Sequence, residues 1–386
     1  MLNLRRKGGV IPDVFGSAAG PRALVSALDR PFRKGLHLKH NNLQEAMEMA
    51  RVLDELGYRV DVVNNDSPAA VDYDRYGLVL GWGQPLDGLF RREAPRRPVA
   101  ILYRCGAYLP FSNGASLDRL EAVRRRRGVW LAGSARLADA GIGCERAVDG
   151  LVVLGNAVTA GRYRAATPKP VFELPLFFHR MLDPQAVLRD RDRTRARNHF
   201  VWFAGSGLVH KGLDLVLEAF ARNPELHLHV YGDLDGEPGF LAAFRRELEA
   251  PNVHVEGFLA LDSPRFREAL LASAFMICPS CAEACNSSVL NICGNGGNVP
   301  VVTRECGIDL GDFGIPVADT TVAAVAAALA AAAALDDAEL DRRLRATAAH
   351  MAREHSLEHY HARLKAAVQA ILAAQADGAG QEGRNP

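Results

Sequence analysis

The stretch Cys278-Pro-Ser-Cys-Ala-Glu283-Ala-Cys-Asn-Ser-Ser-Val-Leu-Asn291-Ile-Cys-Gly, followed by Gly297-Asn-Val-Pro-Val-Val-Thr303, carries the clearest local signals of the chain. It begins where an apolar run, Ala274 to Ile277, predicts a buried strand, and Val299 to Val302 predict another. Between them, Glu283 lies in a loop of small residues before a short helix-like segment. Carboxylates accept hydroxyl hydrogen bonds, and free N–H groups at a helix start hold phosphate. The stretch therefore indicates a site for a hydroxyl-rich, negatively charged ligand.

Strands and helices alternate in two series, one in each half of the chain. In the first series, Gly35 to His40 is the predicted first strand, Asn42 to Leu56 has the apolar spacing of a helix, and Tyr58 to Val63 returns as a strand. The second series starts at Phe200 to Ala204 and leads into the stretch quoted above. Such alternation is typical of parallel sheets covered by helices. We therefore expect an α/β fold with two Rossmann-like domains, whose ligands bind outside the carboxyl ends of the strands.

The expected domain organisation follows from where this alternation starts, stops and is interrupted. Residues without clear periodicity are assigned to the ends, and a dense charge run is assigned to a solvated linker. The expected parts are an N-terminal extension (1–33), a first Rossmann-like domain (34–185), a linker (186–198), a second Rossmann-like domain (199–355), a C-terminal helix (356–374) and a disordered tail (375–386).

Composition indicates a globular protein of the cytoplasm. Of 386 residues, 48% are hydrophobic and 24% charged, which is typical of soluble proteins. Val322 to Leu335 is unbroken by polar residues, but it is too short and too rich in Ala to span a membrane. No signal peptide is visible, because a polar, Gly-rich segment follows the basic residues Met1 to Lys7. The seven cysteines then indicate free thiols in a reducing compartment.

The net charge of +1 conceals an asymmetry between the two halves. Residues 1–185 hold 27 Lys and Arg against 19 Asp and Glu, whereas the remaining residues hold 19 against 26. The arginines of the first half are either a solvated basic face or a contact for an acidic acceptor or the anionic inner leaflet of a membrane. Nucleic acid is not expected as a partner, because no stacking aromatics interleave with these arginines. They are Arg91, Arg92, Arg96, Arg97 and Arg124 to Arg127.

A second loop of small residues opens the second series at Phe203-Ala-Gly-Ser-Gly-Leu-Val-His-Lys211-Gly-Leu-Asp. A predicted strand runs into this loop, and Lys211 stands at the start of a helix. Glycines let a ligand approach the backbone, and the lysine can neutralise a diphosphate. Because many strand-to-helix turns carry Gly and Lys for structural reasons, this loop becomes specific only beside the Pro279 to Thr303 stretch.

Together, the two loops resemble those of retaining glycosyltransferases of the GT-B fold, in the broad group called family 4 (bacterial glycosyl transferases group 1). The resemblance covers residues 200–320. It rests on Gly-x-Gly-x-x-His-Lys-Gly-x-Asp at 205–214 and on Pro279-Ser280-x-x-Glu283 followed by Gly297-x-x-Pro300-Val-Val. A weaker match covers His40-Asn-Asn-x-x-Glu and Gly155-Asn-x-x-Thr159. The resemblance implies two Rossmann-like domains that face each other across a cleft, with a C-terminal helix crossing back to the N-terminal domain.

The resemblance also implies roles for individual residues. The catalytic candidates are Glu283, which would contact the transferred sugar, and Lys211, which would pair with the donor diphosphate. The backbone amides of the helix start would hold phosphate, and a strand end would lie against the base. The donor-binding candidates are Gly205, Ser206, Gly207, Phe258, Leu259, Asn286, Ser287, Ser288 and Asn291. The acceptor-side candidates are His40, Asn41, Tyr108 and Asn156.

Three positions depart from the family pattern. Asn291 stands where a second Glu usually grips the ribose hydroxyls, and an amide lacks charge assistance. Ser206 stands where many relatives carry an Arg beside the phosphates, so one positive charge is missing. Tyr108 stands where many relatives carry a His. These departures motivate an alternative function, a non-catalytic protein of the same fold that binds sugar nucleotides or glycans.

The function implied by the resemblance is a retaining, hexosyltransferase-type glycosyltransferase. It would move a sugar from a nucleoside-diphosphate sugar to a saccharide or lipid-linked acceptor in bacterial envelope or surface polysaccharide synthesis. We expect it in the cytoplasm, with peripheral contact at the inner face of the membrane through the basic first domain. No cofactor and no metal is expected, because Lys211 and the helix-start amides would stabilise the leaving group.

Each candidate also has a structural interpretation. Glu283 would stabilise the start of the helix that follows it, and Lys211 could be a surface lysine. His40 could be a loop histidine, and Tyr108 a packing residue. A third function, a metal or redox protein, would use a cysteine cluster spaced for zinc or iron–sulfur binding. Free cysteines also pack as small hydrophobes, which is the interpretation preferred here. The cluster consists of Cys278, Cys281, Cys285 and Cys293.

Overall fold

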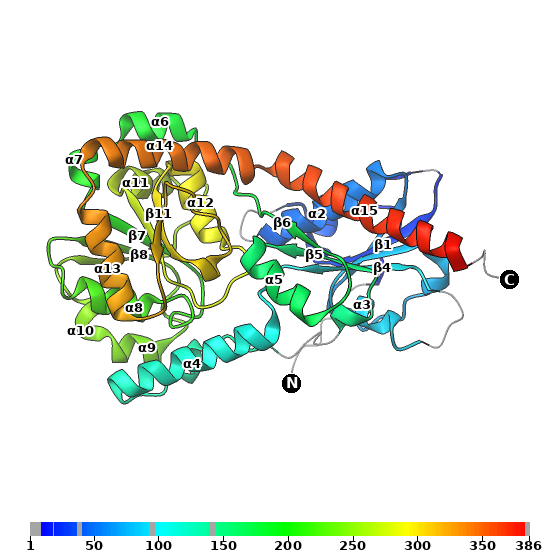
Figure 1. Ribbon diagram of the computed structural model, residues 1–386, viewed down its shortest axis with the longest axis horizontal. Helices are drawn as coiled ribbons and strands as arrows, with labels where there is room; N and C mark the ends of the chain where they lie inside the picture. The colour runs from blue at the N-terminus through cyan, green and yellow to red at the C-terminus, as the bar shows by residue number, and fades with distance from the viewer. Residues whose placement is uncertain (1–8, 18, 37–40, 93–96, 139–143, 383–386) are drawn as a thin grey trace. The chain divides into compact units, whose positions relative to one another are not determined.

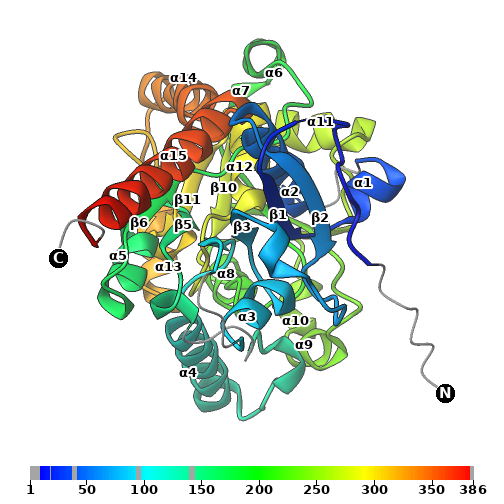
Figure 2. The same cartoon turned by 90° about the vertical axis from the view of Figure 1, so that its right-hand side faces the viewer.

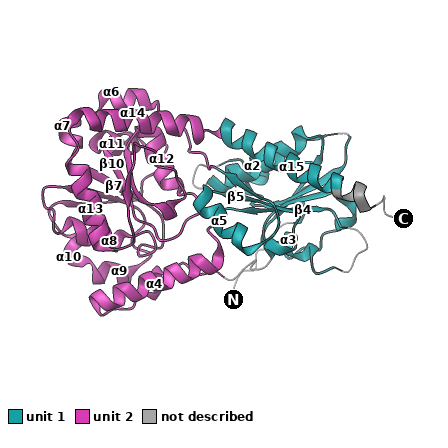
Figure 3. Ribbon diagram, in the orientation of Figure 1, with its two compact units in different colours: residues 1–106, 139–174, 358–386 teal, residues 107–138, 175–357 magenta. Residues whose placement is uncertain are grey.

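The computed structural model describes residues 9–17, 19–36, 41–92, 97–138 and 144–382. The chain divides into two compact units (Figure 3). Unit 1 contains residues 1–106, 139–174 and 358–386, and unit 2 contains residues 107–138 and 175–357. Each unit is built on one six-stranded sheet whose paired strands are parallel. The predicted α/β architecture with two parallel sheets is therefore confirmed.

The sheet of unit 1 has the strand order β2-β1-β3-β4-β5-β6. Its strands are largely buried, as expected for parallel strands with helices on both faces. They are β1 (Arg22–Ala27), β2 (Arg59–Asn64), β3 (Leu78–Gly81), β4 (Val99–Arg104), β5 (Gly150–Leu154) and β6 (Val171–Leu174). The helices of this unit are α1 (Arg30–Lys34), α2 (Asn41–Glu55), α3 (Gln84–Leu89), α5 (Ala157–Ala166) and α15 (Leu357–Glu382).

The start of unit 1 differs from the prediction. β1 lies inside the segment 1–33 that the sequence assigned to an extension, and it pairs with both β2 and β3. Leu24 and Val25 are fully buried in the sheet, so this short apolar run is a central strand without the alternation that marks a half-buried one. Gly35 follows the end of α1 instead of opening a strand. Residues 37–40 of the predicted strand lie outside the described residues.

The C-terminal helix α15 belongs to unit 1, as the resemblance to GT-B glycosyltransferases implied. Its side chains Tyr360 and Leu364 are fully buried. It lies alongside α2 (Figure 2), where the His361 ring nitrogen Nδ1 is 2.8 Å from Glu48 Oε2. The helix continues to Glu382, so the disordered tail predicted from residue 375 is wrong in its first part. The alanines that continue past residue 372 have the highest helix propensity of any residue.

The sheet of unit 2 has the strand order β12-β11-β10-β7-β8-β9. Figure 1 shows α6, α11, α12 and α14 over one face of this sheet and α8 and α13 over the other. The strands are β7 (His199–Phe203), β8 (His227–Tyr231), β9 (Val253–Gly257), β10 (Phe275–Cys278), β11 (Val299–Thr303) and β12 (Ile315–Val317). The helices are α4 (Leu109–Arg127), α6 (Pro184–Asp190), α7 (Arg193–Ala196), α8 (Leu213–Phe220), α9 (Pro238–Ala243), α10 (Arg245–Leu248), α11 (Pro264–Ala272), α12 (Ser287–Gly296), α13 (Val322–Ala333) and α14 (Asp337–Glu354).

The charged run 186–198 is not a solvated linker, because it lies in and around α6 and α7. Arg191 is buried there and donates hydrogen bonds to the carbonyl oxygens of Leu270 at 2.8 Å and Gly296 at 2.7 Å. These carbonyls lie in the last turns of α11 and α12, where backbone acceptors lack intrahelical donors. Burial lowers the pKa of Arg191 to about 9. Arg191, which the sequence assigned to a solvated linker, is thus a buried residue that caps the ends of two helices.

Helix α4 belongs to unit 2, whereas the sequence placed all of 34–185 in one domain. Arg119 donates two hydrogen bonds of 2.7 Å to the Asp214 carboxylate of α8, and both side chains are buried. Arg126 donates to the same carboxylate at 2.6 Å, and Arg127 to Glu247 at 2.7 Å. Bidentate, charge-assisted hydrogen bonds of this kind fix one element to another. Part of the predicted basic face is therefore a structural contact within unit 2.

Candidate functional site

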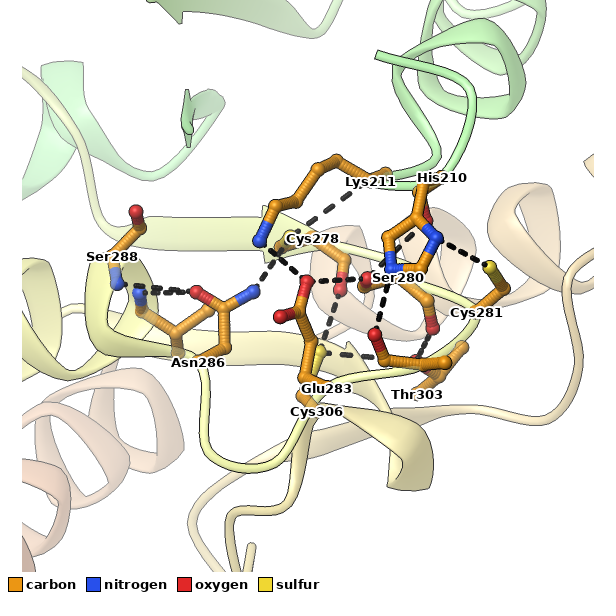
Figure 4. Close-up of polar contacts among 12 residues, drawn as sticks. His210, Lys211, Cys278, Ser280, Cys281, Glu283, Asn286, Ser288, Thr303 and Cys306 are labelled. Atoms are coloured by element: carbon orange, nitrogen blue, oxygen red, sulfur yellow. Dashed lines mark hydrogen bonds and ion pairs between the residues drawn. The ribbon is translucent and has the colours of Figure 1, made fainter. Parts of the chain in front are cut away.

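Lys211 and Glu283 meet at one edge of the sheet of unit 2. Lys211 lies in the loop after β7 and Glu283 in the loop after β10, and these strands are parallel neighbours. Their loops therefore emerge at the same, carboxyl edge. Lys211 Nζ donates to Glu283 Oε1, and Ser280 Oγ donates to the same oxygen at 2.8 Å (Figure 4). Only 10% of the lysine side chain and 13% of the glutamate side chain are exposed.

The positive charges around Glu283 keep it ionised. Burial raises the pKa of this carboxyl, but the charges of Lys211 and Arg136 outweigh burial and lower the pKa to about 2. The group is therefore a carboxylate at any pH near neutral. A carboxylate accepts hydrogen bonds with both oxygens, which suits it to bind sugar hydroxyls.

His210 links the two loops that carry Lys211 and Glu283. Its ring Nε2 lies 2.6 Å from the carbonyl oxygen of Ala282, and its own carbonyl oxygen accepts from the Cys281 N–H at 3.0 Å. Burial lowers the pKa of His210 to about 4, so the ring is neutral and Nε2 carries the proton that reaches the carbonyl. His210 thus positions the adjacent lysine beside the carboxylate.

The loop after β11 completes this arrangement. Thr303 Oγ1 donates to the carbonyl oxygen of Ser280 at 2.5 Å, and the Glu283 N–H donates to the carbonyl oxygen of Glu305 at 2.9 Å. The strands β7, β10 and β11 are consecutive in the sheet. Three neighbouring loops therefore hold the Lys211–Glu283 pair in one geometry.

In the glycine loop 205–207, two of the residues predicted to bind the donor substrate are exposed, whereas the third forms hydrogen bonds within the protein. Gly205 and Ser206 are exposed, whereas Gly207 is buried with a φ of 87°. The N–H groups of Gly207 and Leu208 donate to Glu237 Oε1 at 2.5 and 3.1 Å. Ser134 Oγ donates to the same carboxylate. Glu237 is a buried residue that the sequence analysis missed, because a single acid in a loop carries no motif.

The side chain of Asn286 caps the start of α12. Asn286 Oδ1 accepts from the N–H groups of Ser288 at 3.1 Å and Val289 at 3.2 Å, and the Asn286 N–H donates to the carbonyl of Cys306 at 2.9 Å. Ser287 is the first residue of the helix, where an N–H has no intrahelical acceptor. Of the three amides assigned to phosphate, two are engaged within the protein, and the positive end of the helix dipole lies beside them.

The remaining donor-binding candidates have contrasting environments. Asn291 is buried on α12, and its Oδ1 accepts from the His179 N–H at 2.8 Å. Phe258 is 64% exposed directly after β9, whereas the neighbouring Leu259 is 2% exposed. An exposed aromatic ring at the carboxyl edge of the sheet offers a stacking surface for a nucleobase. Asn291, by contrast, fastens the chain near His179 to α12.

The acceptor-side candidates are spread over both units. Asn41 is the first residue of α2 and is buried. Asn156 caps α5, since its side chain accepts from the Val158 N–H at 3.1 Å. Tyr108 precedes α4 as its N-cap residue and belongs to unit 2. His40 lies outside the described residues.

The four clustered cysteines are buried, and none of them forms a disulfide. Within the described part of the chain, no group of three or more His, Cys, Asp or Glu side chains could hold a metal ion. Burial raises the pKa of Cys281 to about 12, which keeps this thiol protonated. Cys293 is fully buried in α12 and Cys278 ends the buried strand β10. These thiols therefore pack as small apolar groups. None of the described helices combines the length and apolarity that crossing a membrane requires.

Comparison with known proteins finds similarity in structure and not in sequence. No family model matches the chain, and no curated protein matches it. A glycosyltransferase from Rickettsia africae has 12% identity, covers 91% of this chain and 98% of its own, and gives a TM-score of 0.56. Anabaena HepE in complex with UDP has 12% identity, covers 91% and 99%, and gives 0.57. At such identities the likeness shows the fold alone, which is the predicted GT-B fold of these glycosyltransferases.

Proposed function

We propose that this protein is a glycosyltransferase that uses a nucleoside-diphosphate sugar as donor. The observation that carries the proposal is the Lys211–Glu283 pair at the carboxyl edge of the unit 2 sheet. The lysine supplies positive charge for a diphosphate, and the ionised glutamate supplies acceptors for sugar hydroxyls. Phe258 supplies an exposed ring for the base at the same edge. The chain shares its fold with HepE, with a TM-score of 0.55 to the structure of HepE in complex with UDP and glucose, and this likeness supports the same function.

The proposed reaction is hexosyl transfer with retention at the anomeric carbon. The bond between the anomeric carbon and the diphosphate oxygen breaks, and its electron pair stays on that oxygen. The acceptor hydroxyl oxygen forms the new bond on the same face of the sugar, and its proton passes to the oxygen of the leaving diphosphate. Lys211 and the positive end of α12 stabilise the negative charge that develops on the leaving diphosphate. No step in this scheme requires Glu283 to lose or gain a proton, in agreement with its low pKa.

The proposal extends to the setting of the reaction. The acceptor is a saccharide or lipid-linked saccharide of a bacterial envelope or surface polysaccharide, and the protein acts in the cytoplasm. Arg125 supports peripheral contact with an anionic membrane, because its side chain is 75% exposed although it pairs with Glu121. The pairing of Arg126 and Arg127 with acids of unit 2 reduces the charge available for that contact.

The test is release of nucleoside diphosphate from a panel of UDP-, GDP- and ADP-sugars, with and without saccharide acceptors. Glu283→Gln is the test variant, and Glu268→Gln, an exposed residue of α11, is the matched control. We expect turnover with at least one donor, its loss in Glu283→Gln, and no change in Glu268→Gln. Absence of both binding and turnover for every donor would contradict the proposal.

A second candidate function is a non-catalytic protein that binds sugar nucleotides or glycans. The specific observation in its favour is that the Asn291 side chain, at the place expected for a ribose contact, is engaged with the His179 N–H. Binding of a nucleoside-diphosphate sugar in calorimetry without turnover under any acceptor condition would favour this candidate over the enzyme.

A further inference from the structure

Arg136 differs from the arginines of α4, which belong to the same chain segment of unit 2. Arg119, Arg126 and Arg127 each form an ion pair with an acid of unit 2. Arg136 is exposed, and it forms no ion pair with any acid among the described residues. A guanidinium held without a carboxylate partner leaves five N–H donors for a ligand.

The side chain of Arg136 lies over the glycine loop. A Cβ atom added to Gly207 would come within 2.4 Å of Arg136 Cδ and 2.7 Å of Arg136 Cγ. The absence of a side chain at Gly207 therefore leaves space for the aliphatic part of the arginine. Glycine also adopts the positive φ of 87° at this position without strain. The charge of Arg136 also lowers the pKa of both Glu283 and His210. The guanidinium thus acts on the same group of residues as Lys211.

Buried hydrogen bonds fix the segment that carries Arg136. The Arg136 N–H donates to Ser116 Oγ of α4 at 3.0 Å, and Ser116 is 1% exposed. Two residues earlier, Ser134 donates to Glu237, the carboxylate that also accepts from Gly207. The backbone around Arg136 is therefore tied to α4 on one side and to the glycine loop on the other, which preorganises the side chain.

The charges at the site favour an anion larger than one carboxylate. Lys211 carries one positive charge and already contacts Glu283, and Ser206 in the exposed part of the glycine loop carries none. A diphosphate carries more than one negative charge, and a guanidinium binds phosphate oxygens in a bidentate geometry. Arg136, which has no ion-pair partner among the described residues, adds one positive charge for that ligand beside the loop.

We propose that Arg136 is a donor-binding residue that, together with Lys211, binds the diphosphate of the nucleoside-diphosphate sugar. The inference rests on the proposed function, because it assigns a ligand to the same site. Arg136 would supply the positive charge that Ser206 lacks, although it lies about seventy residues earlier in the chain.

The test is calorimetric titration of the full chain with UDP, GDP and ADP and with the corresponding nucleosides. Wild type is compared with Arg136→Met, Arg136→Lys and the control Arg125→Met, an exposed arginine that pairs with Glu121. For the diphosphate that wild type binds, we expect Kd to rise about tenfold to a hundredfold in Arg136→Met, as for loss of charge-assisted hydrogen bonds. Arg136→Lys should recover part of the affinity, and Arg125→Met should bind like wild type.

Nucleoside binding separates a phosphate contact from a structural role. If Arg136 binds the diphosphate, Arg136→Met leaves the Kd of the nucleoside unchanged, and the thermal midpoint stays that of wild type. Equal loss of nucleoside and diphosphate binding would overturn the inference, and so would unchanged diphosphate binding in Arg136→Met. If wild type binds no nucleoside diphosphate at all, the proposed function itself fails.

Discussion

Glu283 in unit 2 and Glu45 in unit 1 are both carboxyl groups with little exposure to solvent, but their neighbours differ. Glu283 contacts Lys211 and lies within the influence of Arg136. Glu45, on α2, has a relative exposure of 0%, and its Oε2 accepts from the Tyr103 hydroxyl at 2.8 Å. Its Oε1 has no hydrogen-bond partner among the described residues. Among the described residues no cation offsets the burial of Glu45, and burial raises its pKa to about 7.

Burial alone therefore does not mark a functional acid. Burial raises the pKa of both groups, and the nearby cations decide the outcome for Glu283. Glu283 remains charged and can accept hydrogen bonds from a ligand. Glu45 is largely neutral below neutral pH and joins α2 to β4 through the Tyr103 hydroxyl, which also lies 2.9 Å from the Tyr360 hydroxyl of α15. The first arrangement suits binding, and the second suits a structural contact.

Removal of the cation should have the largest effect. Lys211→Met leaves Glu283, whose side chain is only 13% exposed, without its direct partner, so we expect kcat for sugar transfer to fall ~10²–10³-fold. The free energy of unfolding should fall by about 3 kcal/mol, as for other broken buried pairs. Steady-state kinetics and urea unfolding measure the two effects.

A double variant supplies the control for this prediction. In Lys211→Met/Glu283→Gln the uncompensated charge is absent, so most of the stability should return while activity stays low. A single variant that keeps full activity would show that the comparison with Glu45 overstates the role of the cation.

Neutralising Glu45 should change the free energy of unfolding by a smaller amount, and should raise it where Lys211→Met lowers it. The folded-state pKa of Glu45, about 7, is higher than the ordinary pKa of a glutamate, 4.5. Its stabilising contribution is therefore complete below pH 4.5 and is lost as the pH rises through 7. Glu45→Gln should be more stable than wild type at pH 8 by about 1–3 kcal/mol, since each pKa unit corresponds to ~1.4 kcal/mol.

Thermal unfolding of wild type and Glu45→Gln between pH 5 and 8 checks this expectation. The advantage of the variant should shrink toward pH 5, because Glu45 is then protonated in the folded wild type. Tyr58→Phe in the same unit is a control that changes a different partly buried hydroxyl. Parallel pH profiles for wild type and Glu45→Gln would mean that Glu45 is ionised like Glu283.

The smallest effect is expected at the opposite edge of the unit 2 sheet. Burial, together with the charges of neighbouring histidines and of Arg195, lowers the pKa of His199 to about 4. For a base, a folded-state pKa below the unfolded value means that stability is full above about pH 6.5 and falls as the pH drops toward 4. The charged and titratable groups around it are His227, His229, His254, Arg195 and, beyond His229, Glu256.

His199→Phe should reduce this acid sensitivity by less than about 1 kcal/mol, as for most single substitutions outside the fully buried core. Chemical unfolding at pH 5 and pH 7.5 measures the difference between the two values for wild type and variant. The result also gives the background against which acid effects at Glu283 are measured. An unchanged difference would show that these histidines do not contribute to it.

The sequence by itself determined the two parallel sheets and the pair at the centre of the site. Apolar periodicity and strand–helix alternation are local properties, so they identified β7, β10 and β11 and the direction in which their loops emerge. Lys211 and Glu283 could be paired because each lies in a loop with its own motif. The membership of α15 in unit 1 came from resemblance alone.

Only the tertiary structure decided which charges are paired. Arg119 and Asp214 are 95 positions apart, and their contact places α4 in unit 2. Arg191, Glu237 and Arg136 resemble ordinary surface or loop charges in the sequence, yet one caps two helices, one holds the glycine loop and one lies over it. The physical reason is that periodicity acts between residues a few positions apart. The partner of a charge, and with it its pKa and its role, depends on the residues that folding brings near it.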